Sequence, residues 1–123
     1  MTNAVEIASI IKQQITPGVL MSLGAHNLRS GTMHHEKACQ PLPGLVFNAR
    51  ILPFRKDGKR SSQPRIMQVM VLLDPSDTYL IDVSYRPRRY DRANVTHFHT
   101  EGVYAADLSR ILLALDSDDD RAA

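Results

Sequence analysis

The segment at residues 66–85, IMQVMVLLDPSDTYLIDVSY, constrains the fold more than any other part of the chain. Its first half is apolar at nearly every position, which is typical of a central strand covered on both faces. The letters DPSD follow, with an aspartate that can bond the backbone and then a proline with a preset φ, and they indicate a type I turn. Residues 78–85 then alternate apolar and polar side chains, as a half-buried strand does. The segment therefore predicts an antiparallel hairpin, because a link this short cannot join parallel strands.

Helical patterns lie at both ends of the chain. Residues 4–14 carry apolar side chains at intervals of three and four, which predicts a helix with one apolar stripe. The threonine–proline pair at 16–17 is typical of an N-cap followed by the first helical position, so residues 17–23 form a second short helix that ends before a glycine. A third apolar stripe predicts a helix over residues 103–115.

The remaining strand patterns complete the expected topology. Residues 45–52 and 95–100 alternate as strands do, and residues 25–29 offer a short fifth strand. Residues 30–43 contain glycine, prolines and histidines and are expected to form a long loop. The order of two helices, four or five strands and one helix predicts an α+β fold. Its sheet is an antiparallel meander, and the C-terminal helix packs on one face.

Size and composition agree with one globular domain. We expect residues 1–115 of the 123 to form a single α+β domain and residues 116–123 to form an acidic flexible tail. Hydrophobic residues make up 43% of the chain and charged residues 23%, which is ordinary for folded proteins. A single cysteine excludes an intrachain disulfide. No secretory signal or long apolar run is apparent, so the expected location is cytoplasmic, with no membrane contact.

Basic residues gather in two of the expected connectors. Residues 50–92 contain ten basic and five acidic side chains, although the net charge of the whole chain is only +2. Both connectors leave the predicted hairpin opposite its turn, so they should lie at the same edge of the sheet. Guanidinium groups bind phosphates bidentately, and Tyr85 and Tyr90 would offer stacking surfaces beside them. The alternative is a solvated basic face with Tyr85 in the core. The candidate binding residues are Arg55, Lys56, Lys59, Arg60, Arg65, Arg86, Arg88, Arg89 and Arg92.

Possible metal ligands form a weaker pattern. His34, His35 and Cys39 share the long loop, and His97 and His99 are expected on one face of a strand, where a pair two residues apart can chelate. There is no CxxC or HxxxH spacing, so solvated histidines are the alternative, and we expect no metal or other cofactor. The chain also lacks a P-loop, a GxGxxG motif and a nucleophile motif, so we expect no enzymatic activity.

Three stretches together resemble a family of small uncharacterised proteins from phages and other bacterial mobile elements. They are ITPGVLMSLGAHNLRSG, VMVLLDPSDTYLIDVSY and EGVYAADLSRILLAL. The family shares a GA-x-N turn, a D-T-Y strand start and a V-Y-A-x-x-L helix start. These correspond here to Gly24, Ala25 and Asn27, to Asp77, Thr78 and Tyr79, and to Val103, Tyr104, Ala105 and Leu108. The resemblance implies a small binder, such as an inhibitor of host defence or an accessory to DNA replication and transfer, and brings no catalytic residue with it.

The sequence therefore leads to one main expectation and two alternatives. The main expectation is a small non-enzymatic binding protein that contacts nucleic acid or a nucleoprotein through a basic edge. The first alternative is a protein-binding inhibitor of a host system, acting through the sheet face or the long loop. The second alternative is a small zinc-binding protein.

Overall fold

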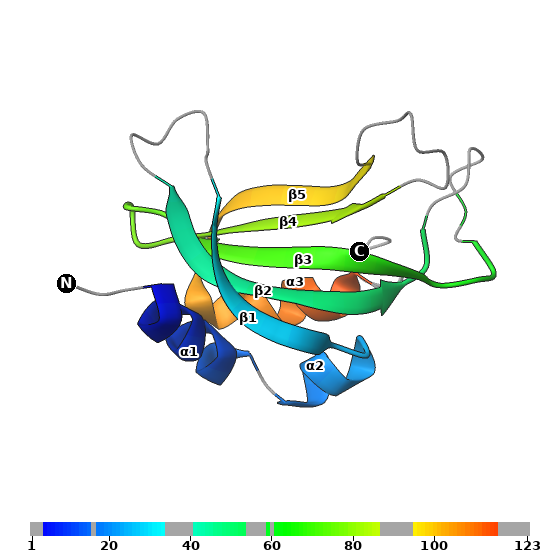
Figure 1. Ribbon diagram of the computed structural model, residues 1–123, viewed down its shortest axis with the longest axis horizontal. Coiled ribbons are helices and arrows are strands. Elements are labelled where there is room, and N and C mark those ends of the chain that lie inside the picture. Colours follow the sequence, from blue (N-terminus) through cyan, green and yellow to red (C-terminus); the bar gives the residue numbers. More distant parts are fainter. Residues whose placement is uncertain are drawn as a thin grey trace.

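The chain forms an α+β fold in the computed structural model, which describes residues 4–15, 17–33, 41–53, 59, 61–86 and 95–115. Two N-terminal helices precede a five-stranded antiparallel sheet, and a helix follows it (Figure 1). This confirms the predicted fold class, with the larger of the two expected strand numbers. The acidic tail at residues 116–123 lies outside the described residues. None of the described helices is long and apolar enough to span a membrane.

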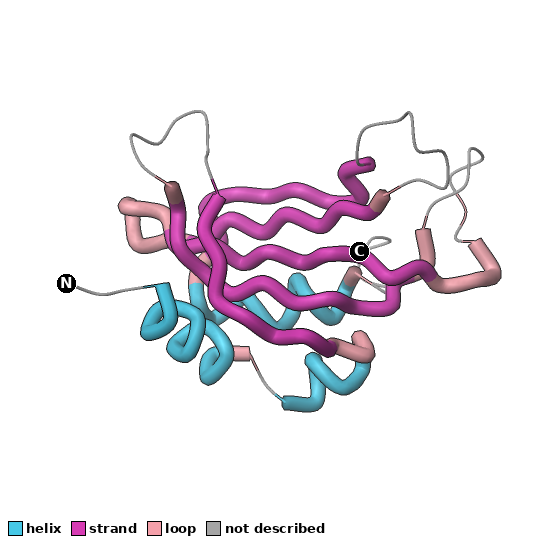
Figure 2. Tube along the Cα trace, in the orientation of Figure 1, coloured by secondary structure: helices cyan, strands magenta, loops and turns pink. Residues whose placement is uncertain are grey.

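The elements follow one another in a simple meander. The helices are α1 (Ala4–Gln14), α2 (Pro17–Ser22) and α3 (Leu108–Ala114), with a 3₁₀ turn, η1 (Ala105–Asp107), directly before α3. The strands are β1 (His26–Met33), β2 (Leu42–Ile51), β3 (Arg65–Leu73), β4 (Tyr79–Tyr85) and β5 (Val95–Val103). Each strand pairs with the next one along the chain, in the order β1-β2-β3-β4-β5. The helices lie together on one side of this sheet (Figure 2).

One main core fills the space between the helices and the sheet. Alternate residues of β2, β3 and β4 point toward the helices, and the apolar stripes of the helices meet them. The sheet contributes Leu45, Phe47, Ala49, Ile51, Met67, Val69, Val71, Tyr79, Ile81 and Val83. The helical layer contributes Ile7, Ala8, Ile11, Ile15, Val19, Leu23, Leu108, Leu112 and Leu115. Burial of these apolar side chains is the main favourable term that holds the two layers together.

The hairpin between β3 and β4 has the turn that its sequence predicts. The Asp77 backbone N–H donates to the Asp74 carbonyl oxygen at 3.0 Å, and the Ser76 backbone N–H donates to Asp74 Oδ2 at 3.0 Å. Asp77 adopts a left-handed φ of 69°, a conformation that aspartate tolerates better than most residues. The turn sets the register in which Leu73 lies opposite Tyr79.

The sheet is longer than the sequence pattern indicates at its first hairpin. Residues 30–33 belong to β1 and pair with the start of β2, although a loop was expected over residues 30–43. Gly31 lies directly opposite Gly44, so the strands pair there through backbone groups, without the alternating apolar side chains that reveal a strand. The prediction of a loop over these residues is therefore wrong at both of its ends.

The C-terminal helix begins later than expected. Val103 still belongs to β5, lies opposite Tyr79 and is buried, so residues 103–104 are not helical. Gly102, just before it, has a φ of +67°, a conformation that helix residues do not adopt. Burial of Val103 in the sheet therefore outweighs the helical spacing of the apolar residues from 103 onward.

The face of the sheet that points away from the helices, which we call the open face, carries a second small apolar cluster. Leu42, Leu72 and Leu80 are buried there, and Met70 packs against them. The first part of β3 differs, because Ile66 is 58% exposed. The prediction that β3 is covered on both faces is therefore confirmed at Leu72, but it is wrong at the beginning of the strand.

Candidate functional site

Four described basic residues lie at the end of the sheet opposite the β3–β4 turn. Arg50 is the next-to-last residue of β2, Lys59 lies in the connector to β3, Arg65 begins β3 and Arg86 directly follows β4. The register places Ile51 opposite Arg65, and it brings the end of β4 beside the beginning of β3. We call Arg50, Lys59, Arg65 and Arg86 the basic end.

The basic end presents charge on both sides of the sheet. Ala49 and Ile51 are buried against the helices, so Arg50 between them points to the open face and is exposed. Arg65 lies opposite Ile51 and therefore on the helix side. Its guanidinium carbon is 4.9 Å from the centroid of the Tyr85 ring, a cation–π contact that restricts the arginine side chain. Tyr85 also packs against the main core, so its ring is not a free stacking surface.

The arginines of the basic end have no anionic partner within the part of the chain that the structure describes. The ion pairs found there join His99 to Asp82 and Glu101, and Arg110 to Asp107. Arg50, Arg65 and Arg86 are not among the described residues with further partners. Cations that lack a carboxylate partner near solvent attract anions from solution.

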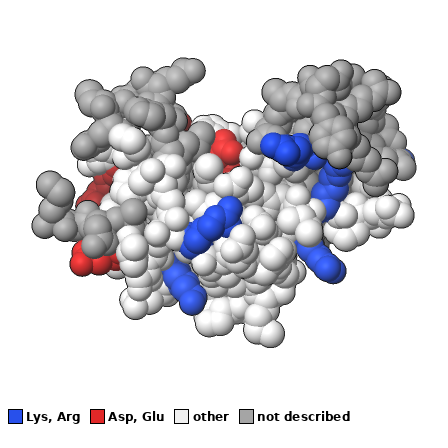
Figure 3. Space-filling model, in the orientation of Figure 1, with Lys and Arg blue, Asp and Glu red and all other residues white. Residues whose placement is uncertain are grey.

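Acidic residues lie toward the opposite end of the sheet. Asp74 and Asp77 belong to the β3–β4 turn, and Glu101 lies near the end of β5. A cavity of about 380 Å³ between these segments is lined in part by Asp74 and Glu101. On the face in Figure 3, acidic side chains lie mainly on the side of this turn, and basic ones lie in the middle and toward the other end. Basic and acidic side chains of the described residues are therefore separated toward opposite ends of the sheet.

Part of the predicted binding surface falls outside the described residues. Lys59, Arg65 and Arg86 lie at the expected end of the sheet. The other predicted members, Arg55, Lys56, Arg60, Arg88, Arg89 and Arg92, are outside the described ranges, as is Tyr90.

A row of polar side chains crosses the open face next to the basic end. Asn48 of β2, Gln68 of β3, Ser84 of β4 and Thr96 of β5 lie directly opposite one another from strand to strand. We call these four residues the polar row. None of them is predicted as a site residue, although the alternation in residues 45–52 and 78–85 places Asn48 and Ser84 on a polar face. Their alignment depends on strand register, which the sequence does not show.

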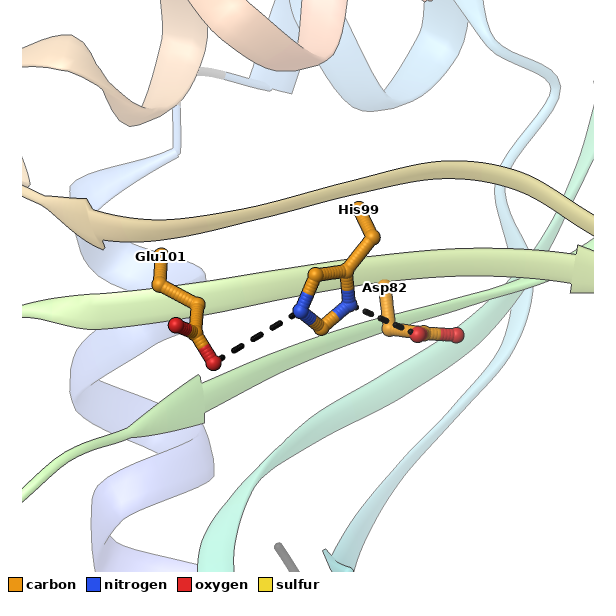
Figure 4. A network of polar contacts seen from close by, with 3 residues as sticks. All are labelled: Asp82, His99 and Glu101. Carbon is orange, nitrogen blue, oxygen red and sulfur yellow. Dashed lines mark hydrogen bonds and ion pairs between the residues drawn. The ribbon is translucent and has the colours of Figure 1, made fainter. Parts of the chain in front are cut away.

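His99, on the open face, takes part in a three-residue network (Figure 4). His99 Nδ1 lies 3.0 Å from Asp82 Oδ2, on the paired position of β4, and His99 Nε2 lies 3.6 Å from Glu101 Oε1 on its own strand. The two carboxylates hold the imidazole from both sides and tie the edge strand β5 to β4. The arrangement is therefore accounted for as a cross-strand contact.

The expected pairing of His97 with His99 on one strand face does not follow from this register. Val83 lies opposite Phe98 and Ser84 opposite Thr96, so His97 is an extra residue in β5. Such a bulge breaks the strict alternation on which the prediction rested.

Within the described ranges, no group of three or more His, Cys, Asp or Glu residues is arranged to hold a metal ion. His34, His35 and Cys39 lie outside these ranges. Among the described residues, His97 and His99 therefore have no additional side chains beside them that would complete a zinc site.

No known family model, curated protein sequence or solved structure matches the chain. The resemblance to small phage and mobile-element proteins accordingly stays a prediction.

Proposed function

We propose that this protein is a non-enzymatic binding protein that contacts nucleic acid, free or within a nucleoprotein, through the basic end. The observation that carries the proposal is the position of Arg50, Arg65 and Arg86 at one end of the sheet, without a carboxylate partner in the described part of the chain. The resemblance to phage and mobile-element proteins supports the same class of function, and we propose such an origin on that basis.

The chemistry of these side chains suits phosphate. Each guanidinium presents a planar set of donors that matches the oxygens of a phosphate group. The three arginines come from neighbouring strands, which lie about 4.8 Å apart. An extended phosphate backbone that crosses the strand ends can therefore meet more than one of them. Contacts of this kind release counterions from the nucleic acid, so the affinity should fall as salt rises.

The proposal is tested by fluorescence anisotropy with labelled single-stranded DNA, duplex DNA and single-stranded RNA at low ionic strength. We expect binding by the wild-type protein and a large loss for the double variant Arg50→Ala, Arg86→Ala. Both residues are exposed, so their removal should leave the core intact. Arg110→Ala is the matched control, because Arg110 is an exposed arginine on the helical side and is paired with Asp107. Absence of binding to all three probes would refute the proposal, as would equal losses in the double variant and the control.

A further inference from the structure

We infer that the polar row reads the bases of a single-stranded nucleic acid whose phosphates lie on the basic end. This inference rests on the proposed function and adds the substrate class and the residues that select it. It depends on three observations: the alignment of the row, its unpaired hydrogen-bonding groups and its distance from the arginines.

The alignment of the row follows from the strand register. Asn48 lies opposite Gln68, Gln68 opposite Ser84, and Ser84 opposite Thr96. Residues directly opposite each other in antiparallel strands point to the same face. The neighbours of Gln68 in β3, Met67 and Val69, are buried against the helices, so the whole row points to the open face.

The side chains of the row keep their hydrogen-bonding capacity. No hydrogen bond joins the Asn48, Gln68, Ser84 or Thr96 side chain to another residue in the described ranges, and none of them has a partner beyond these ranges. Asn48, Gln68 and Ser84 are half-buried, and Thr96 is exposed. The row therefore offers two amides and two hydroxyls, each able to donate and to accept.

The basic end lies within reach of one nucleotide from this row. Arg50 is two residues beyond Asn48 and Arg86 is two beyond Ser84, a separation of about 6.6 Å along each strand. Ile66 lies opposite Arg50 and is 58% exposed on the same face, where it can contact a sugar or a base. A phosphate on the arginines thus leaves its base beside the amides and hydroxyls.

The chemistry of the row favours single strands over duplexes. Bases in a duplex present their edges only inside the grooves, whereas splayed bases can lie on a sheet face and be hydrogen-bonded on their edges. The row contains no aromatic residue, so recognition by hydrogen bonds is expected in place of stacking. Asparagine and glutamine pair bidentately with adenine, which makes adenine-rich strands the preferred ligand.

The experiment compares labelled single-stranded DNA homopolymers of A, C and T with the dA·dT duplex, by anisotropy at fixed salt. We expect the wild-type protein to bind the dA strand about 10-fold more tightly than the dC and dT strands, the discrimination against a wrong base that is typical of one good bidentate pair, and to bind the dA strand more tightly than the duplex. Gln68→Ala should remove most of this preference while the salt dependence stays unchanged. Ser84→Ala, which changes little volume, gives a second measure, and thermal unfolding of each variant verifies its fold. Gln13→Ala is the matched control, because Gln13 is an exposed amide on α1.

Each outcome separates the inference from the proposed function. Loss of the dA preference in Gln68→Ala, with the Gln13 variant unchanged, supports the inference. The inference is overturned if the wild-type protein binds duplex and single strands equally. It is also overturned if the Gln68→Ala and Ser84→Ala variants are folded and keep the wild-type preference for the dA strand. If the Arg50→Ala, Arg86→Ala variant still loses binding in that case, the proposed function stands. A wild-type protein that binds none of these probes overturns both.

Discussion

The substitution Gly44→Ala tests the close approach of β2 and β3, on which the position of the basic end and the polar row depends. A Cβ added at Gly44 would lie 2.0 Å from the Val71 carbonyl oxygen and 2.7 Å from Leu72 Cα. Both are backbone atoms of β3, so no side-chain rotation relieves the clash. The strands must separate locally by about 1.3 Å to reach an ordinary carbon–oxygen contact of about 3.3 Å.

The cost of this separation follows from the contacts that it disrupts. A displacement of this size weakens about two ladder hydrogen bonds, each worth about 1 kcal/mol net. It also loosens Leu72 and Leu42, which are 0% and 1% exposed, and full burial of such a side chain is worth about 1.5–3 kcal/mol. We therefore expect Gly44→Ala to lower the free energy of unfolding by about 2–4 kcal/mol, a large fraction of the stability of a typical domain.

Urea unfolding followed by circular dichroism measures this loss, with two other glycine-to-alanine variants as controls. A Cβ at Gly31 would lie 2.7 Å from Val46 Cγ2, a methyl group that can rotate away at a cost of about 1 kcal/mol. Nothing lies within 4 Å of a Cβ at Gly18, in helix α2, so alanine there should be neutral or stabilise by up to about 1 kcal/mol. Equal unfolding midpoints for the Gly44 and Gly18 variants would refute the close approach of β2 and β3 at Gly44.

Two further substitutions test contacts around the β3–β4 turn. The Tyr79 hydroxyl donates to Gln14 Oε1 at 2.6 Å and joins β4 to α1, so Tyr79→Phe should lower the free energy of unfolding by about 1 kcal/mol in chemical denaturation. Burial and, to a smaller extent, the charge of Asp77 raise the pKa of Tyr79. Because the pKa is raised in the folded state, the stabilisation by the protonated Tyr79 hydroxyl is complete below about pH 10 and is lost as the pH rises further. The wild-type and Tyr79→Phe proteins should therefore converge in stability at alkaline pH. A difference in stability that stays constant with pH would contradict this. Asp77→Gly should increase the free energy of unfolding by about 0.5 kcal/mol, because glycine adopts the left-handed φ of 69° without strain. The thermal midpoint should rise slightly as a result. A lower midpoint would contradict the left-handed conformation at this position.

The fold was largely predictable because its main elements carry strong local patterns. The helical stripe of α1, the turn at residues 74–77 and the alternation in β4 each depend on residues that are close in sequence, so they can be recognised from the sequence alone. The end of β1 and the start of β2 were missed, because Gly31 and Gly44 pair through their backbones and leave no side-chain pattern. The extension of β5 to Val103 was missed because that residue fits both a helical stripe and a strand opposite Tyr79.

The candidate site was predictable only in part, since it combines local composition with long-range register. The approach of Arg65 and Arg86 follows from the hairpin alone. The membership of Arg50 and the alignment of Asn48 with Gln68 require the β2–β3 register, and no local signal sets that register. The contact of His99 with Asp82 likewise depends on the bulge in β5, which shifts the pairing by one residue.

The most direct test of the central claim is the slope of log affinity against log salt for a single-stranded oligonucleotide. Each phosphate contact contributes about 0.7 to the magnitude of this slope. The proposed basic end predicts that the wild-type slope exceeds that of the Arg50→Ala, Arg86→Ala variant by about 1.4, whereas Arg110→Ala leaves the slope unchanged. A double variant with the wild-type slope, or an Arg110 variant with the same reduction, would contradict binding of nucleic acid through the basic end.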